Sequence, residues 1–224
     1  MVMTTVSVDS LVALGFVLGL RHAIEADHLA AISTIVTERR SLLSSSLVGA
    51  FWGVGHALAL LMAGVGVLLL RYQLTDRMAH ALELCVGVML VVLGFNVLRT
   101  LVRRGASQDH DHRSGPSHSH TYVWLVSRPL LIGMVHGLAG SAPLLLLALT
   151  AMASPLAAFS YIAVFGLGSM MGMTIMSVLV GVPARLTVQF ARTNLAVRGL
   201  SGMLSVALGL FIVYENAVLN RLVA

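Results

Sequence analysis

The sequence contains few charged residues and almost no cysteine. Only 10% of its 224 residues are charged, whereas 58% are hydrophobic. Because a soluble domain carries about 25% charged residues, the composition excludes an ordinary soluble protein and indicates an integral membrane protein. The single cysteine, Cys85, excludes a disulfide framework and a paired-cysteine thiol site.

Lysine is absent, so arginine supplies the whole basic count and the net charge of +5. The arginines fall between apolar segments rather than on one soluble face, and we therefore expect no nucleic-acid partner. The nucleotide-binding motif GxxxxGK[ST] and the zinc-peptidase motif HExxH are both missing. These absences argue against an ATP-driven protein and against a membrane metalloenzyme, so the sequence predicts that the protein is not an enzyme.

Apolar segments long enough to cross a bilayer fill most of the chain. A span needs about 20 apolar residues, and this rule predicts an all-α integral membrane protein with six transmembrane helices in contact with lipid. The first ten residues lack the basic segment of a cleaved signal peptide, so the first span is expected to remain. The predicted spans are 8–36, 42–70, 79–102, 126–152, 155–183 and 195–219.

The distribution of arginine between the connections predicts the orientation. Ten arginines fall on one side of the membrane and three on the other. Because arginine-rich connections stay in the cytoplasm, we expect a multi-pass protein of the inner (plasma) membrane with both termini outside. The ten are Arg39, Arg40, Arg99, Arg103, Arg104, Arg113, Arg128, Arg185, Arg192 and Arg198, and the three are Arg71, Arg77 and Arg221.

The second half of the chain resembles the first at an offset of 113 to 115 residues. A unit of three helices ends opposite to where it began, so a second unit must sit upside down. We therefore expect two inverted three-helix repeats, 1–102 and 126–224, joined by a flexible histidine-rich cytoplasmic loop, 103–125. Such repeats place a substrate site near the midplane. The matched segments are Gly19–Asp27 with Gly133–Ser141, Trp52–His56 with Phe165–Ser169, and Gly87–Gly94 with Gly202–Gly209.

A polar cluster interrupts the first predicted span. A charge at the bilayer centre costs roughly 2.5 to 3.5 kcal/mol, so such groups are retained for partners or for function. One interpretation is an internal salt bridge of the arginine with a carboxylate, beside hydrogen-bonded histidines. The other is a site for a divalent cation, which would offset the excess negative charge. The cluster consists of Arg21, His22, Glu25, Asp27 and His28.

The spacing within this cluster does not suit a regular helix. At 100° per residue, Glu25 lies about 60° from both His22 and His28, whereas Asp27 lies about 140° from His22. All four side chains cannot point at one ion. Either the helix unwinds around residues 23–26, as broken transporter helices do, or a subset ligates and the rest form a supporting shell.

Two further histidines fall within apolar spans. His56 follows two glycines in the second span, and His136 is the repeat counterpart of His22. A lone membrane histidine is often only hydrogen-bonded, and His136 lies near the poor ligands Ser141 and Pro143. Imidazole together with carboxylate suits ions such as Ni²⁺, Co²⁺ and Zn²⁺, and disfavours Ca²⁺ and Mg²⁺. The sequence thus predicts a borderline transition metal as transported substrate, with no resident cofactor.

Two other features allow a metal interpretation beside a structural one. The loop histidines suit metal capture as a cytoplasmic buffer or sensor, or belong to a solvated linker. The methionine run suits a Cu(I) path, but methionine is also ordinary adaptable packing, which we favour. The loop residues are Asp109, His110, Asp111, His112, His118 and His120, and the methionines are Met170, Met171, Met173 and Met176.

Three segments carry a family resemblance. The segment RHAIEADHL resembles the RHAxDADHI signature of the nickel/cobalt transporter superfamily (NiCoT/NicO). GAFWGVGHAL resembles that family's glycine-rich second motif, and HGLAGSAPL resembles the fourth-helix motif of its UreH-like branch. The resemblance implies a nickel or cobalt permease with ligands His22, Asp27, His28 and His56. Glu25 stands where the family has Asp, and six spans replace the eight of many members, which fits the UreH-like branch.

The sequence thus favours a secondary transporter that brings Ni²⁺ or Co²⁺ into the cell by alternating access. The carboxylates would supply negative charge, and the histidines would supply selectivity. The energy would come from an ion gradient, from the membrane potential or from a partner protein. The alternative is efflux by the same fold, suggested by the cytoplasmic histidine loop. No sequence feature sets an oligomeric state.

Overall fold

The computed structural model describes residues 8–37, 41–70, 75–106, 120–140 and 154–219. These residues form helices and short connections, and none of them lies in a strand, so the predicted all-α class is confirmed. The longer helices are α1 (Val8–His22), α2 (Ala26–Val36), α3 (Leu42–Leu70), α4 (Asp76–Ala106), α5 (His120–Gly140), α7 (Pro155–Leu186) and α8 (Ala191–Tyr214). The short 3₁₀ helix η1 (Thr187–Gln189) precedes α8, and the π-helical turn η2 (Glu215–Leu219) follows it.

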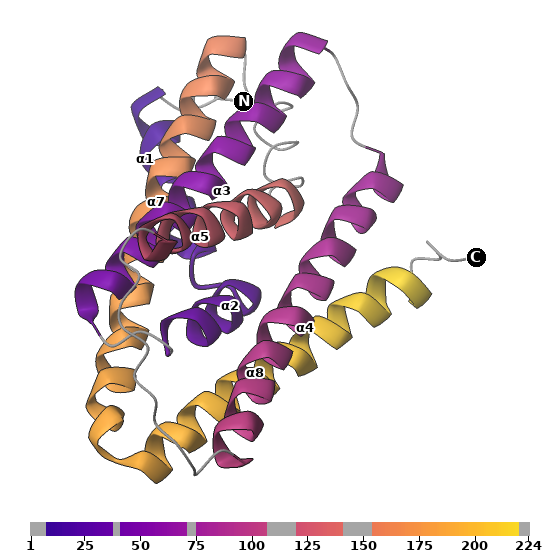
Figure 1. Cartoon of the computed structure of the whole chain (residues 1–224). Coiled ribbons are helices and arrows are strands. Elements are labelled where there is room, and N and C mark those ends of the chain that lie inside the picture. Colours follow the sequence, from indigo (N-terminus) through magenta and orange to yellow (C-terminus); the bar gives the residue numbers. More distant parts are fainter. Residues whose placement is uncertain (1–7, 38–40, 71–74, 107–119, 141–153, 220–224) are drawn as a thin grey trace, which may run out of the picture.

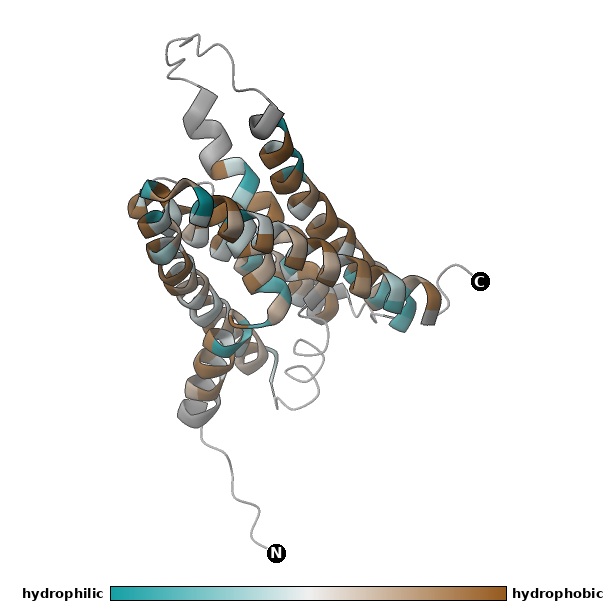
Figure 2. Cartoon of the chain, turned by 90° about the horizontal axis from the view of Figure 1, so that it is seen from below, coloured by the Kyte–Doolittle hydropathy of each residue, from teal (hydrophilic) through white to brown (hydrophobic). Residues whose placement is uncertain are grey.

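The length and surface of these helices define an all-α membrane protein. Within the described residues, α3, α4, α7 and α8 are long and apolar enough to cross a bilayer, and hydrophobic residues run along most of their length (Figure 2). Large apolar side chains such as Val92, Phe95, Leu204 and Phe211 are more than half exposed. Lipid tails accommodate such surfaces, whereas water would penalise them.

The first predicted span, 8–36, is not one continuous helix, and its break lies at residues 23–25, where the sequence offered unwinding as one of two alternatives. α1 ends at His22, and α2 begins at Ala26 after a turn in which the Glu25 amide donates to the His22 carbonyl. Alanine and glutamate are good helix formers, so local propensity does not cause the break. Tertiary packing does: Ala23 is fully buried, and a Cβ on Gly172 of α7 would lie 2.7 Å from the Ala23 Cβ.

The predicted loop 103–125 is too long at both ends. α4 continues to Ala106 and α5 begins at His120, which leaves 107–119 outside the described residues. Arginine forms helices well, and its charge is favourable in the last turn of a helix, so Arg103 extends α4. The predicted span 126–152 is described only as far as Gly140.

Close helix crossings depend on glycine at defined positions. A Cβ on Gly55 of α3 would collide with the Leu130 carbonyl of α5, and one on Gly168 of α7 would collide with the Phe16 carbonyl of α1. α4 and α8 lie side by side (Figure 1), and Gly87 faces the carbonyl of Gly209 there. The helix backbones therefore approach closely where a side chain is absent.

The helices enclose the core in two groups. α5 crosses the group formed by α1, α3 and α7, and α2 lies between that group and the α4–α8 pair (Figure 1). Trp52, Ile32, Leu90 and Met173 are fully buried in the main core cluster. The second part of the broken span, α2, is thereby held against this core, with His28 among its buried residues.

Candidate metal site

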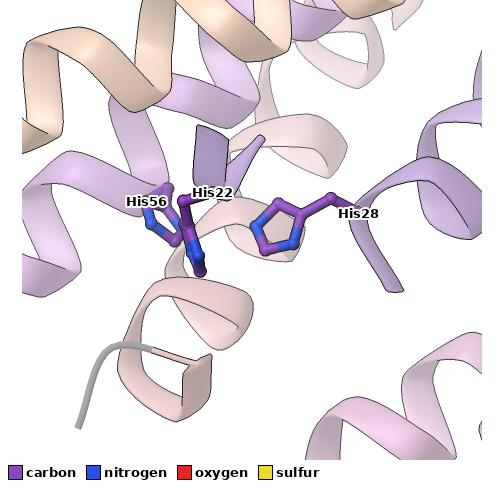
Figure 3. Close-up of side chains that lie close together, drawn as sticks. All are labelled: His22, His28 and His56. Carbon is purple, nitrogen blue, oxygen red and sulfur yellow. The ribbon is translucent and has the colours of Figure 1, made fainter. Parts of the chain in front are cut away.

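Four helix segments bring four histidines together at the centre of the molecule. His22 is the last residue of α1, and His28 lies in the first turn of α2. His56 comes from the middle of α3 and His136 from α5. His28, His56 and His136 are fully buried, and His22 is 2% exposed. The break after His22 lets His28 approach from the opposite side, as Figure 3 shows.

Three of these residues, His22, His28 and His56, form what we call the histidine cluster. The ring centroids of His22 and His28 lie 4.5 Å apart, and those of His22 and His56 lie 5.0 Å apart. Each residue offers one ring nitrogen, and these three nitrogens lie within 4.8 Å of one another. Small side-chain rotations bring nitrogens at this spacing to the bond length of about 2.0–2.1 Å that imidazole makes with Zn²⁺ and similar ions.

Asp27 lies beside the histidine cluster and joins it to His136. The Nδ1 group of His28 donates to Asp27 Oδ1 at 3.0 Å, and Asp27 Oδ2 lies 2.7 Å from His136 Nε2. A carboxylate in this position fixes the tautomer and orientation of an imidazole and leaves its second nitrogen free for a metal. Asp27, His28 and His136 also form a second group with ligand atoms within 4.8 Å.

The buried ring nitrogens are short of hydrogen-bond partners. Within the described part of the chain, no hydrogen bond satisfies Nε2 of His28, Nε2 of His22 or either nitrogen of His56. An unsatisfied buried polar group costs roughly 1–3 kcal/mol. Coordination to one cation would satisfy one ring nitrogen of each of the three residues, and neutral imidazole is a preferred ligand of first-row transition ions. The donor set therefore fits the predicted metal.

The charged members of the polar cluster do not lock together. Glu25 is half exposed, and its Oε2 lies 3.0 Å from His22 Nδ1. Asp27 pairs with His28 and His136, and Arg21 is exposed, with no ion pair to Glu25 or Asp27. The internal salt bridge that was one interpretation of the sequence is therefore not formed. The sequence left two ways to form a metal site, an unwound helix or a subset of the ligands on a regular helix. The structure contains the unwound helix.

Aromatic residues that sequence reasoning did not single out for the site enclose it. The Trp52 ring stacks on His28 with the planes 8° apart and the centroids separated by 5.6 Å. Phe165 of α7, which the predicted repeat pairs with Trp52, has its ring centroid 5.5 Å from that of His22. The available signal was the position of Trp52 one helical turn before His56. These rings exclude water from one side of the histidine cluster.

The remaining sequence candidates lie elsewhere. His110, His112 and His118 fall outside the described residues, and only the backbone of His120 is described. Met173 is fully buried in the core, whereas Met171 is 43% exposed. This arrangement fits the packing interpretation of the methionines.

In an all-α membrane protein, a buried histidine and carboxylate cluster is typical of proteins that carry ions or protons across the membrane. The chain is 34% identical over 223 residues to the urease accessory protein UreH of Bacillus sp. (strain TB-90), a match that covers 98% of this chain and 97% of the relative. The chain belongs to the UreH-like branch of the nickel/cobalt transporter family. It is accordingly not an enzyme.

A more distant relative comes from a plant. The chain is 26% identical over 212 residues to the chloroplast protein FOR GROWTH AND FERTILITY 2 of Arabidopsis thaliana, and it spans 55% of that protein's length. No family model and no solved structure gives a significant match.

Proposed function

We propose that this protein is a secondary transporter that moves Ni²⁺, or Co²⁺, into the cytoplasm through the histidine cluster. The observation that carries the proposal is the set of buried, unpaired ring nitrogens on His22, His28 and His56. A membrane protein keeps such costly groups where a passing ion satisfies them. Membership in the nickel/cobalt transporter family supports the same substrate class.

The glycine crossings support an arrangement in two inverted three-helix repeats with six spans. Gly133 faces the Trp52 carbonyl, and Gly19 faces the Phe165 carbonyl, so one contact is the counterpart of the other at an offset of 113 to 114 residues. Between α4 and α8, Gly87 contacts Gly209 and Gly94 contacts Gly202. The repeat offset relates these two contacts to each other in the same way. This pseudo-twofold relation is expected of an inverted repeat with its site at the interface of the units.

The two ligand groups suggest how an ion moves through the site. His28 belongs to both groups, with Asp27 and His136 on one side and His22 and His56 on the other. An ion first held by Asp27 exchanges this oxygen for imidazole nitrogen without leaving His28. Rocking of one repeat against the other then opens the site to the opposite face, and a gradient supplies the energy.

The arrangement of the helix ends supports the predicted orientation. The end of α4 and the connection from α7 to α8 lie at the same end of the molecule (Figure 1), and Arg103, Arg185 and Arg192 belong to these segments. Such an arginine-rich end faces the cytoplasm. Both termini, and the beginning of α4, are then outside.

Efflux by the same fold is the second candidate, favoured by the histidines in 107–119, which would collect excess cytoplasmic metal. Total cellular nickel decides between the two. Expression of the importer raises cellular nickel at a fixed external concentration, and expression of an exporter lowers it.

The test is accumulation of radiolabelled nickel in cells that express the wild type, His22→Ala or His56→Ala at equal membrane levels. We expect uptake to fall at least tenfold in both variants, because loss of one of three nitrogen ligands weakens the site. Thr100→Ala is the control, since this hydroxyl donates only to the Asn96 carbonyl of its own helix. Normal uptake by the histidine variants refutes the proposed site.

A further inference from the structure

A cavity of about 250 Å³ lies beside the histidine cluster. Its described lining comes from α2, α4, α5, α8 and η2, and it is strongly acidic. Four carboxylates, Glu25, Asp27, Glu83 and Glu215, line it together with Asn216, and no arginine is among the described lining residues. We call this cavity the acidic vestibule. Four carboxylates around one small space attract cations strongly and repel anions.

Two lining residues of the acidic vestibule, Asp27 and Glu25, are in direct contact with the buried histidines. Asp27 contacts His136 at 2.7 Å and His28 at 3.0 Å. Glu25 Oε2 lies 3.0 Å from Nδ1 of His22, which is 2% exposed. Two of the four carboxylates that line the cavity thus touch histidines with unpaired ring nitrogens. An ion in the cavity reaches the histidine cluster by exchanging ligands, without crossing apolar core.

The other two lining carboxylates, Glu83 and Glu215, are what we call the rim, and they lie beside a network of polar contacts between α4 and η2. Glu83 of α4 is 42% exposed, and its Oε2 lies 3.9 Å from His80 Nδ1. The same His80 nitrogen lies 3.0 Å from Asn216 Oδ1, and the Asn216 amide donates to the Ile212 carbonyl. Glu215 opens the π-helical turn in which Asn216 lies. Such turns in a helix are frequent at functional sites, and here the turn places Glu215 in the lining of the cavity.

A second cavity, of about 80 Å³, has the opposite chemistry. Asn96, Thr34 and Arg128 supply its described polar lining, which contains no carboxylate. It lies about ten residues further along α4 than Glu83, a distance of roughly 15 Å along the helix. The charge on the two sides of the site is therefore asymmetric, and a dication is attracted to the acidic side.

From this geometry we infer that the acidic vestibule is the entry path for the metal, and that Glu83 and Glu215 capture the hydrated dication before Asp27 receives it. The inference rests on the proposed transport function and extends it to two residues outside the buried site. Carboxylate oxygen binds first-row transition ions less selectively than imidazole does. Capture at the rim is therefore weak and fast, and the ion moves on to tighter nitrogen ligands.

The test compares Glu83→Gln, Glu215→Gln and the double variant, which keep side-chain size and remove charge. We expect the KM for initial nickel uptake to rise about three- to tenfold in the double variant, with Vmax unchanged. The dependence of KM on ionic strength should weaken at the same time. Asp76→Asn is the matched control, because it removes one exposed carboxylate from the first turn of the same helix, outside the cavity.

The outcomes separate the two proposals. If the wild type does not accumulate nickel, or if His56→Ala accumulates it normally, the transport function fails. If the wild type transports and the double variant keeps its KM, the entry path fails alone. An equal rise of KM in Asp76→Asn, or a fall of Vmax at constant KM in the double variant, also overturns capture at the rim.

Discussion

At the scale of single residues, the two nitrogens of His28 have different partners. Nδ1 donates to Asp27, and Nε2 lies unpaired among the other rings. Asp27 also accepts at its second oxygen, beside His136, so one carboxylate orients two imidazoles. This explains why the structure tolerates a carboxylate next to buried histidines: its contribution is orientation and negative charge, both of which favour a bound cation.

Substitution of Asp27 tests this role. Asp27→Asn keeps the shape but removes the charge, and its amide group can no longer accept at both atoms. Because carboxylates that support ligating histidines contribute a factor of 10 to 100 to metal affinity, we expect a loss of this size. Calorimetric titration of the purified protein with nickel measures it, with Asp76→Asn as control. An unchanged Kd would contradict the orienting role.

The residue scale also shows what the sequence pattern could predict. Intramembrane polarity and the family motifs point to His22, Asp27, His28 and His56. The structure brings the three histidines together and places Asp27 against His28. The vestibule residues Glu83 and Glu215 were not identified. They lie near the ends of spans, where an acidic side chain is unexceptional, and only the fold places them beside Asp27.

At the scale of the elements, the interrupted first span and the glycine crossings determine the geometry of the site. The interruption separates His22 and His28 onto two helices, which removes the angular conflict of a regular helix. The crossing of α3 with α5 brings both His56 and His136 against His28, because Gly55 and Gly133 allow the backbones to approach.

A matched pair of glycines on α3 tests the importance of this crossing. In Gly55→Ala the added Cβ meets the Leu130 carbonyl of α5, whereas in Gly66→Ala nothing lies within 4 Å. Overpacking of this kind costs about 1–3 kcal/mol. We expect Gly55→Ala to lower the melting temperature in detergent and Gly66→Ala to leave it unchanged. Equal melting temperatures would show that the crossing tolerates a side chain.

At the scale of the whole molecule, the asymmetry of charge corresponds to a direction across the membrane. The arginine-rich helix ends lie at one end of the molecule, and the acidic vestibule opens between the beginning of α4 and the end of α8. In the proposed orientation, with the arginines in the cytoplasm, the vestibule would face outward, and a dication would enter from the side that its charge favours.

Cysteine labelling in intact cells checks this orientation. After Cys85→Ala removes the native thiol, Asp76→Cys should react with a membrane-impermeant maleimide from outside. Gln189→Cys, exposed in η1 between α7 and α8, should react only after permeabilisation. The reverse pattern would place the vestibule in the cytoplasm and favour efflux.

The sequence by itself determined the membrane environment, the helical class and the chemistry of the proposed metal ligands. Composition and the length of apolar runs set the first two, because backbone groups in lipid must be satisfied within each segment. Only the tertiary structure decided the break after His22, since Ala23–Glu25 carries no helix breaker and the burial of Ala23 against Gly172 interrupts the helix. The acidic vestibule likewise depends on the packing of α2, α4, α5 and α8, because long-range contacts, which local sequence does not specify, bring its carboxylates together.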